Sequence, residues 1–302
     1  MEHIISEKLW KALACPYCGG SLSTGEVGVI CKKCKENFSI EQNGQIDLRL
    51  TKEKTDQVKY RLGVDMFPED EFDLHLLDVN PDSPIDLSQQ ESFFHLPNVL
   101  LSHFPKAQKA GALMLDLGSG ASPHKKVVEK LDFEWVGLDF EAKEAPLLGD
   151  AHALPFKDDQ LEFVLSIQTF EHLNYPFIAA KEVFRTLKPG GKFIGTVSFL
   201  EPYHQYSFFH QTHLGVRTLL TTAGFEIDAI SPYPRTALQA LGKMAFFRPL
   251  PLWLVKILVW PMEMTHRIWW KLGYLLTRNP RASDTYRRFS TASSFMFIAT
   301  KA

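Results

Sequence analysis

The run Ala112-Leu-Met-Leu-Asp-Leu117, followed directly by Gly118-Ser-Gly-Ala-Ser-Pro123, decides the fold that we expect for this chain. Such an apolar run is typical of a strand that is buried on both faces of a sheet. Glycines placed directly after a strand let the backbone approach a ligand closely. The sequence therefore predicts a ligand site at the carboxyl end of strand 112–117.

Further apolar runs alternate with helix-length segments on the carboxyl side of this strand. Runs at 134–138, 161–167 and 193–197 are separated by segments long enough for helices. This alternation is typical of strand-helix units that build a parallel sheet. We therefore expect an α/β fold with a doubly wound, mostly parallel sheet, whose site lies at the strand ends.

An acidic residue stands at the end of the second apolar run. Asp139 follows Leu138 and lies nineteen residues after Gly120. At this position a carboxylate can accept hydrogen bonds from both hydroxyls of a ribose. The glycine-rich turn and the acid together favour nucleoside binding. A nicotinamide dinucleotide stays an alternative, although Pro123 occupies the third small position of a dinucleotide fingerprint.

All four cysteines lie near the start of the chain, as the two pairs Cys15-Pro-Tyr-Cys18 and Cys31-Lys-Lys-Cys34. Two such pairs can offer four thiolates to a tetrahedral zinc ion, and an ion with four cysteine ligands is structural. Two disulfides are the alternative. The first ten residues lack the apolar core of an export signal, which favours a cytoplasmic protein and zinc.

Five ordered motifs carry a resemblance to a known family: Asp116-x-Gly-x-Gly120, Asp139, Gly149-Asp-Ala151, Glu171-His-Leu173 and Leu187-Lys-Pro-Gly-Gly191. Over residues 113–230 the chain resembles the class I S-adenosylmethionine-dependent methyltransferases, especially the ubiquinone- and menaquinone-biosynthesis-like group. The resemblance implies a seven-stranded Rossmann-like methyltransferase fold and S-adenosylmethionine as cofactor. Residues 8–50 resemble the zinc-ribbon family typified by the activator subunit of tRNA methyltransferases, which implies a helper role.

The resemblance assigns five residues to the methionine and ribose parts of the cofactor. Gly118, Ser119 and Gly120 would bring the backbone to the methionine end. Asp116 would support the ammonium group, and Asp139 would hold the ribose. The chain departs from the family pattern directly after these residues, because Ser122 stands where a third glycine is often seen.

The remaining candidates lie further along the chain. Asp150, with the backbone at Ala151, would read the adenine, and Phe140 would contact the ring unless it is an ordinary core residue. His172 follows the fourth strand of the fold and is the candidate base for an acceptor that carries a hydroxyl or amine. A structural hydrogen-bonding role is the alternative for His172.

Charge is segregated along a chain whose 33 basic and 35 acidic side chains nearly cancel. The near balance argues against an electrostatic grip of the whole protein on nucleic acid. Residues 65–91 hold nine acidic side chains and no Lys or Arg, whereas residues 235–302 hold eleven basic against two acidic ones. The carboxyl-terminal part can therefore favour anionic partners.

A long insertion is expected between the last two strands, at 224–230 and 294–300. Residues 235–290 are rich in Trp, Phe and Leu, interleaved with Lys and Arg. An antiparallel return places such an insertion at the carboxyl edge of the sheet, where it could act as a lid. We consider two forms, a helical cover packed on the sheet and a contact of 243–278 with the inner membrane face.

These observations divide the chain into a zinc ribbon (1–50), an acidic linker with a helical segment (51–110) and a methyltransferase domain (111–302) with a helical lid insertion (235–290). We expect methyl transfer by in-line displacement to a small, apolar or lipid-like acceptor. One alternative is an RNA methyltransferase that recognises ribosomal or transfer RNA through the ribbon. The other is a non-catalytic, cofactor-binding adaptor whose ribbon binds a protein partner.

Overall fold

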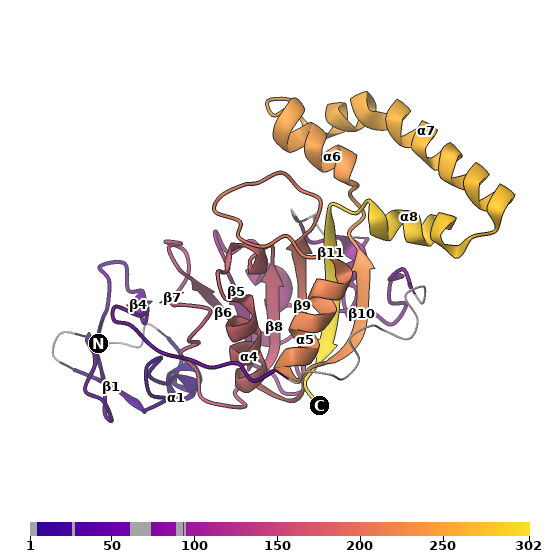
Figure 1. Ribbon diagram of the computed structural model, residues 1–302. Helices are drawn as coiled ribbons and strands as arrows, with labels where there is room; N and C mark the ends of the chain where they lie inside the picture. Colours follow the sequence, from indigo (N-terminus) through magenta and orange to yellow (C-terminus); the bar gives the residue numbers. More distant parts are fainter. Residues whose placement is uncertain (1–4, 26–27, 61–73, 89–92, 94) are drawn as a thin grey trace.

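Figure 1 shows a computed structural model, which describes residues 5–25, 28–60, 74–88, 93 and 95–302. A twisted sheet with helices on both faces occupies the middle of the molecule. Short strands near the amino terminus lie beyond one edge of this sheet, and a helical lobe projects above its other end.

Four parallel strands form the centre of the sheet. In spatial order they are β9 (Leu187–Ser198), β8 (Leu161–Ile167), β5 (Ala112–Leu117) and β6 (Phe133–Asp139). All six residues of β5 are buried, as expected for an apolar strand with neighbours on both sides. The parallel order confirms the predicted fold class.

Alternate side chains of β5 enter two separate apolar layers. Leu113 and Leu115 belong to the layer on one face of the sheet, whereas Met114 belongs to the layer on the other. Since strand side chains alternate between faces, a strand that is apolar throughout needs a cover on both. The covering helices are α4 (Pro176–Thr186) and α5 (His213–Ala223) on the first face, and α2 (Asn98–Leu101) and α3 (Lys125–Glu129) on the second.

Two antiparallel pairings complete one edge of the sheet. Strand β11 (Ser294–Thr300) lies between β9 and β10 (Glu226–Pro232) and runs antiparallel to both. The carboxyl end of β10 therefore lies at the same edge as those of the parallel strands. The chain leaves the sheet there, and the following insertion begins beside the predicted ligand site.

At the opposite edge the sheet has an eighth strand, where seven were predicted. Strand β4 (Ile46–Asp47) pairs in parallel with β7 (Leu147–Leu148), the outer neighbour of β6. The Ile46 amide donates to the Pro146 carbonyl at 3.1 Å, and the Leu48 amide donates to the Leu148 carbonyl at 2.8 Å. The extra strand comes from the ribbon, so the ribbon continues the sheet of the larger domain.

The rest of the ribbon consists of α1 (Glu7–Ala12), β1 (Leu22–Thr24), β2 (Gly28–Cys31) and β3 (Asn37–Ser39). The three strands form a small antiparallel sheet of their own. A second row of backbone bonds joins the ribbon to the larger domain, where the Ala14 amide donates to the Pro155 carbonyl at 3.0 Å. The ribbon therefore lies against the domain of its own chain.

The insertion between β10 and β11 is helical. It contains α6 (Ala237–Leu241), a π-helical turn (Gly242–Phe246), α7 (Leu252–Thr277), the 3₁₀ turn η3 (Pro280–Ala282) and α8 (Asp284–Ser290). Of the residues of α7, Val255, Val259 and Glu263 are buried. They pack within the lobe that α6, α7 and α8 form above the sheet (Figure 1).

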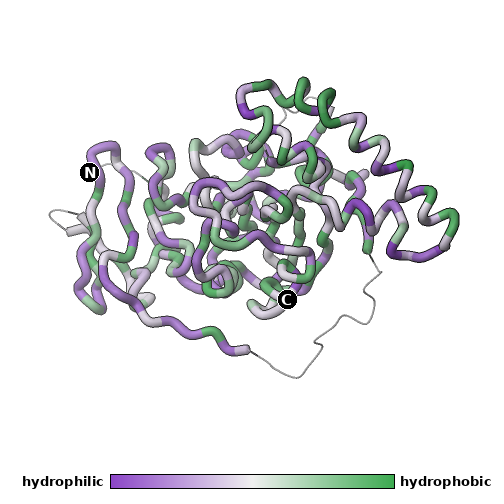
Figure 2. Tube along the Cα trace, turned by 45° about the horizontal axis from the view of Figure 1, so that its top comes forward, coloured by the Kyte–Doolittle hydropathy of each residue, from purple (hydrophilic) through white to green (hydrophobic). Residues whose placement is uncertain are grey.

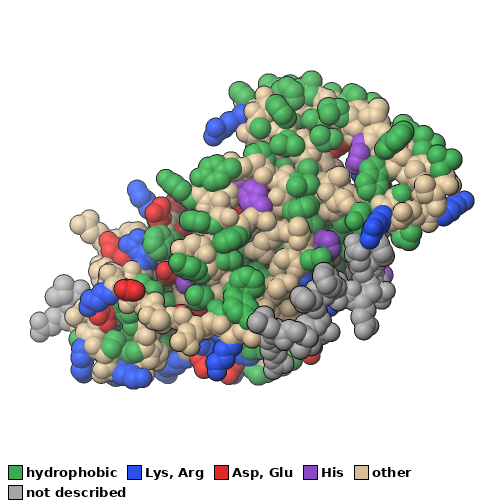
Figure 3. All heavy atoms as spheres, in the orientation of Figure 1, with side chains coloured by type: hydrophobic (Ala, Val, Ile, Leu, Met, Phe, Trp, Pro, Cys, Tyr) green, Lys and Arg blue, Asp and Glu red, His purple; other side chains and the backbone are tan. Residues whose placement is uncertain are grey.

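The exposed side of α7 is apolar, which is unusual for a surface helix. Trp253, Trp260, Trp269 and Leu276 are between 59% and 84% exposed. Figure 2 shows hydrophobic residues along the whole of this helix, and Figure 3 shows their side chains gathered over the lobe. The lobe thus projects above the sheet and presents an apolar face on α7 (Figure 1). Among the described residues, no helix has both the length and the apolar character needed to cross a membrane.

The predicted acidic linker and helical segment at 51–110 is described only in part. Its described helix is α2. Residues 61–73, 89–92 and 94, which carry several of the acidic side chains in 65–91, lie outside the described residues.

Phe156 tests whether the ribbon and the larger domain share one core. Its side chain is 1% exposed, and its backbone forms a bridge with Leu13 of the ribbon. Replacement of a buried Phe by Ala removes apolar contacts and leaves a cavity, which costs about 3–5 kcal/mol.

We expect Phe156→Ala to lower the free energy of unfolding by this amount, measured by urea denaturation. Phe246→Ala, at a site 74% exposed, should change it by less than about 0.5 kcal/mol, and equal losses would contradict a shared core.

Candidate functional site

The glycine-rich turn after β5 is held tightly against the neighbouring strand. The amides of Gly118 and Ser119 both point to the Leu138 carbonyl, at 2.8 and 3.2 Å. Gly118 and Gly120 have φ angles of +74° and +48°, in the left-handed region that favours glycine. Ser122 also has a positive φ of +58°, so it takes the conformation that the glycine often seen at this position would adopt more easily.

Thr169 closes the turn from the other side. A Cβ atom on Gly118 would lie 2.3 Å from the Thr169 Oγ1 atom, which is far inside van der Waals contact. The Thr169 hydroxyl itself donates to the Leu117 carbonyl at 3.1 Å. Gly118 is therefore required by packing as well as by its φ angle.

Asp139 is bonded directly to this turn. Its Oδ2 atom accepts a hydrogen bond from the Gly120 amide at 3.0 Å, and its Oδ1 atom accepts from the amides of Glu141 and Ala142, both at 3.0 Å. The glycine-rich turn and Asp139, which are nineteen residues apart in the sequence, are thus in direct contact. Three backbone donors hold the carboxylate at the end of β6.

Asp116 occupies a more enclosed position at the end of β5. Its side chain is 1% exposed, and its Oδ2 atom accepts from the Trp135 indole nitrogen at 3.2 Å. The Nδ1 atom of His124 lies 3.4 Å from the same oxygen. The neighbouring Ser119 hydroxyl is buried and has no hydrogen-bond partner among the described residues.

Asp150 and Ala151 lie beside Asp139, because the Gly149 amide donates to the Asp139 carbonyl at 3.0 Å. The Asp150 Oδ1 atom accepts from the His152 amide at 2.9 Å and contacts the His152 ring at 2.6 Å. Burial raises the pKa of Asp150, but these bonds outweigh burial, so the pKa lies below its ordinary value. The carboxylate is consequently charged at neutral pH.

Phe140 differs from a core residue, since its ring is 53% exposed. The guanidinium of Arg49, from the end of the ribbon, lies 5.6 Å from the ring centroid and donates to the Phe140 carbonyl at 3.1 Å. All eight residues predicted to contact a cofactor therefore lie at the ends of β5 and β6 or in the turns after β5, β6 and β7. The ribbon reaches the margin of this region through Arg49.

His172 lies on η1 (Phe170–His172), the 3₁₀ turn that follows β8. Its Nδ1 atom is buried and has no hydrogen-bond partner within the part of the chain that the structure describes, and its ring centroid is 5.4 Å from that of His204. Burial and the neighbouring His204 lower the pKa of His172, against the effect of hydrogen bonds with the Gln205 and Tyr206 backbone. The ring is neutral at pH 7, as a proton acceptor must be.

Glu171, the neighbour of His172, has a more unusual environment. Its side chain is fully buried, and burial raises its pKa to about 7 although hydrogen bonds with backbone and with Ser198 act in the opposite direction. Sequence reasoning used Glu171 only as part of a motif and gave it no role. Its position beside a candidate base was the one signal in the sequence.

The four cysteines come together at one end of the ribbon. Their sulfur atoms lie within 4.8 Å of one another, with 3.6 Å between Cys15 and Cys34 and 3.5 Å between Cys18 and Cys31. A disulfide would require about 2.05 Å, whereas four thiolates around zinc are about 3.8 Å apart. The sulfur positions therefore fit a tetrahedral metal site and not two disulfides.

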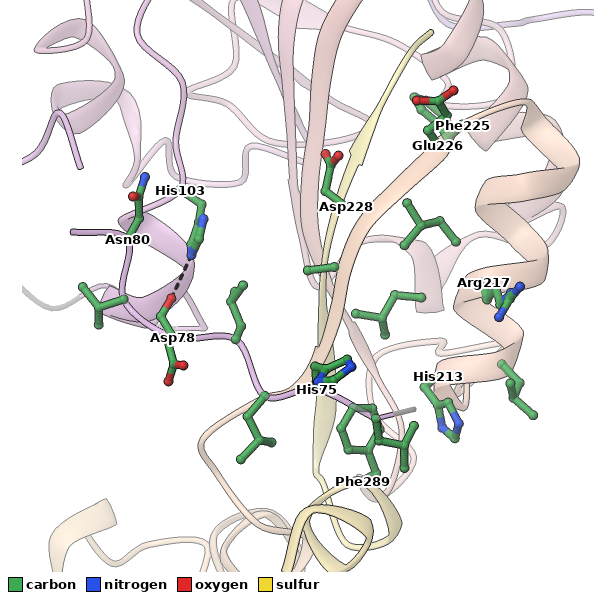
Figure 4. A pocket seen from close by; sticks show the side chains of 18 of the residues that line it. His75, Asp78, Asn80, His103, His213, Arg217, Phe225, Glu226, Asp228 and Phe289 are labelled. Atoms are coloured by element: carbon green, nitrogen blue, oxygen red, sulfur yellow. Dashed lines mark hydrogen bonds between the residues drawn. The ribbon is translucent and has the colours of Figure 1, made fainter. Parts of the chain in front are cut away.

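A spacious cavity lies elsewhere in the molecule. It has a volume of about 890 Å³ and is lined by the segment 74–81 on one side and by α5 and β10 on the other (Figure 4). His103 and Asp78 are hydrogen-bonded across its margin, with 2.9 Å between the His103 Nε2 atom and the Asp78 carbonyl. None of the predicted site residues lines this cavity.

Comparisons with known proteins agree with the arrangement at the strand ends. Residues 115–195 match the family model of a methyltransferase domain. An uncharacterized methyltransferase of Mycobacterium leprae is 29% identical over 98 residues, which is 28% of this chain and 36% of that protein. Residues 115–195 are therefore similar to a methyltransferase domain, which agrees with the motifs that indicated this family.

A longer match includes an uncharacterized protein of Methanocaldococcus jannaschii. It is 32% identical over 152 residues, which is 46% of this chain and 62% of that protein. The chain thus spans less than two thirds of the length of either relative. A solved structure of the complex between the Haloferax volcanii Trm112 methyltransferase activator and a methyltransferase matches 68% of this chain and 89% of its own chain, with 19% identity and a TM-score of 0.45.

The contact between Gly118 and Thr169 can be tested with two glycine variants. Gly118→Ala and Gly111→Ala both place a side chain at a positive φ, +74° and +73°, but a Cβ atom on Gly111 would have no atom of the described residues within 4 Å. The two variants share the backbone strain of about 1 kcal/mol. We expect Gly118→Ala to lose about 1–3 kcal/mol more, since Thr169 must move. If urea denaturation shows the same loss of unfolding free energy in both variants, Thr169 moves aside without an energetic cost, which would contradict this prediction.

Proposed function

We propose that this protein transfers a methyl group from S-adenosylmethionine to a small, apolar or lipid-like acceptor. The observation that carries the cofactor assignment is the bond between the Gly120 amide and the Asp139 carboxylate within a methyltransferase domain. A glycine-rich backbone and an acid of the type that binds ribose hydroxyls lie at the same edge of the sheet, which supports this assignment.

The cofactor would lie across the ends of β5, β6 and β7. Gly118, Ser119 and Gly120 would meet its methionine part, and the unpartnered Ser119 hydroxyl is a free hydrogen-bonding group there. Asp116 is enclosed beneath the turn, so it would act on the ammonium group through its charge. Asp139 would accept hydrogen bonds from the ribose.

The adenine would lie on the β7 side of Asp139. Asp150, which is charged, and the Ala151 backbone would bind its polar edge. The exposed ring of Phe140 would cover its face, and Arg49 would hold that ring from the ribbon. In this proposal the ribbon serves the cofactor site of its own chain and is stabilised by a zinc ion bound to the four cysteines.

Transfer from a sulfonium is an in-line displacement, in which alignment of the acceptor, the methyl carbon and the sulfur supplies most of the rate enhancement. An acceptor hydroxyl or amine must also lose a proton. His172, neutral and close to the turn that holds Gly118, is the candidate to take this proton.

The lobe above the sheet supports a lipid-like acceptor. Its segment 243–278 carries six Lys or Arg side chains and one acidic residue, Glu263, which is buried. Exposed Trp and Leu side chains combined with a basic rim are typical of helices that lie in the interface of an anionic membrane. We propose that α7 binds such a surface and brings the site at the strand ends to a lipid-like acceptor.

The cofactor assignment is tested by calorimetric titration with S-adenosylmethionine. Asp139→Asn keeps the size of the side chain but removes a charged acceptor for the ribose, which costs about 1.5–3 kcal/mol. We therefore expect affinity to fall by about tenfold or more. Asp228→Asn, on β10 at the far edge of the sheet, should bind as the wild type does, and equal binding by Asp139→Asn would contradict the assignment.

The acceptor class is tested by methyl transfer from labelled cofactor to separated lipid and RNA fractions. We expect label in the lipid fraction. If only the RNA fraction is labelled, the acceptor is RNA and the proposal of a lipid-like acceptor is wrong. Cofactor binding without label in either fraction would favour the adaptor alternative.

The membrane contact is tested by sedimentation with vesicles that contain phosphatidylglycerol. Each basic residue near an anionic surface contributes about 1 kcal/mol, so Lys256→Gln with Lys271→Gln should weaken binding by about thirtyfold. The exposed pair Lys106→Gln with Lys126→Gln, on the body of the protein, is the matched control. If the wild-type protein does not sediment with the vesicles at low salt, the proposed membrane contact is wrong.

A further inference from the structure

A second group of metal-ligating side chains lies at the carboxyl edge of the sheet, apart from the cysteines. Glu171 and His172 belong to η1, and His204 belongs to the loop between β9 and α5. One ligand atom from each of the three lies within 4.8 Å of the others. Thr169, two residues before Glu171, touches the glycine-rich turn, so this group borders the proposed cofactor site.

Two atoms of this group, the Oε2 atom of Glu171 and the Nδ1 atom of His172, are buried without a hydrogen-bond partner among the described residues. The same holds for the Nε2 atom of His210, a neighbour of the group. The His210 ring centroid is 5.7 Å from that of His204. Buried polar atoms are nearly always paired, because an unpaired one loses its hydration without compensation. The unpaired atoms of Glu171 and His172, which belong to adjacent residues, therefore indicate that a polar ligand binds there.

The local hydrogen bonding shows an excess of acceptors. The Ser198 hydroxyl has one proton, yet it lies 2.7 Å from the Gln168 Oε1 atom, 2.9 Å from a Glu171 oxygen and 3.1 Å from a Glu201 oxygen. One hydroxyl cannot satisfy three acceptors. A bound cation, or another hydrogen-bond donor, would satisfy the acceptors that this hydroxyl leaves unpaired.

The charges of Glu171 and Glu201 also favour a bound cation at this place. Glu201 forms an ion pair with Arg235, so its charge is balanced. Glu171 has no Lys or Arg within ion-pair distance among the described residues. A buried carboxylate without a counter-ion is costly, and a bound cation removes that cost.

The tautomer of His204 suits metal binding. Its Nδ1 atom lies 2.9 Å from the Pro202 carbonyl, so the proton sits on Nδ1 and the lone pair on Nε2 is free. Metal-bound histidines commonly donate their other ring nitrogen to a carbonyl or carboxylate in this way. His204 is therefore already oriented as a ligand.

We propose that Glu171, His172 and His204 bind a divalent transition-metal ion of the zinc class. Two imidazoles and one carboxylate form a donor set used by catalytic zinc and by non-haem iron, with bonds of about 2.0–2.2 Å. Three protein ligands leave at least one position open. The ion would also join η1 to the loop between β9 and α5.

This inference rests on the proposed function and narrows its acceptor to one that carries a hydroxyl. A hydroxyl at the open position would have a lowered pKa, so that its proton leaves to solvent. An oxygen lone pair would then form the bond to the methyl carbon while the carbon–sulfur electron pair stays on sulfur. The metal would thereby replace His172 in the role of activating the acceptor, because His172 would be one of its ligands, and the transfer of the methyl group from S-adenosylmethionine would be unchanged.

Metal stoichiometry of the full chain tests the site. The protein is stripped with a chelator under reducing conditions, reloaded with Co²⁺ and freed of excess ion, and the bound metal is then counted. We expect two equivalents in the wild type, one in the ribbon and one at Glu171, and one equivalent in Glu171→Gln and in His204→Ala. His103→Ala, which removes a histidine at the cavity of Figure 4, should keep two.

The cobalt–thiolate absorption of the ribbon is the folding control, because it should be unchanged in every variant. If Glu171→Gln fails to fold, the half-buried His204 still allows the test. One equivalent in the wild type, located by its thiolate absorption, would overturn the proposed site.

Calorimetric titration with S-adenosylmethionine on the same samples separates this inference from the function on which it rests. Cofactor binding with a single metal equivalent would overturn the metal site and leave the methyltransferase proposal intact. Two equivalents without cofactor binding would support the metal site and contradict the methyltransferase proposal. In His204→Ala we expect unchanged cofactor affinity and loss of methyl transfer.

Discussion

The hydrogen bond between the Gly120 amide and the Asp139 carboxylate is the constraint on which the candidate site depends. It fixes the turn after β5 to the end of β6, while Gly118 fits against Thr169 after β8. The three strand ends are thereby held in one arrangement. A site built from turns gains precision when each turn is bonded to a rigid neighbour. The same three strands carry the apolar layers on both faces, so the core and the site share one framework.

The sequence allowed the prediction of those parts that follow from local pattern. The apolar run 112–117 gave a buried strand because its composition suits burial on both faces, and Asp139 could be placed by its distance from Gly120. The cysteine spacing indicated a cluster that the sulfur positions now fit. The insertion at 235–290 was visible because two strand-like runs stand far apart. In each case a short stretch of sequence was enough to predict the feature.

Other features depend on contacts that no local pattern records. Strand β4 has two residues and is a strand because β7 pairs with it, and two residues are too short a stretch to show such a pairing in the sequence. Glu171 and His204 lie 33 positions apart in the chain, and only the loop between β9 and α5 brings them together. The exposure of α7 could not be foreseen either, since tryptophans and leucines at helical spacing fit a buried helix equally well.

The position of β11 has a consequence for how the protein is made. When β9 emerges from the ribosome, its outer edge is unpaired, and the strand that will occupy that edge follows only after β10 and the whole helical lobe. An apolar edge left open for this long can pair with another chain. Early docking of α4 and α5 on β9 would shield its face but not its edge. In cells, the yield of this protein should therefore depend on chaperones that hold nascent chains apart.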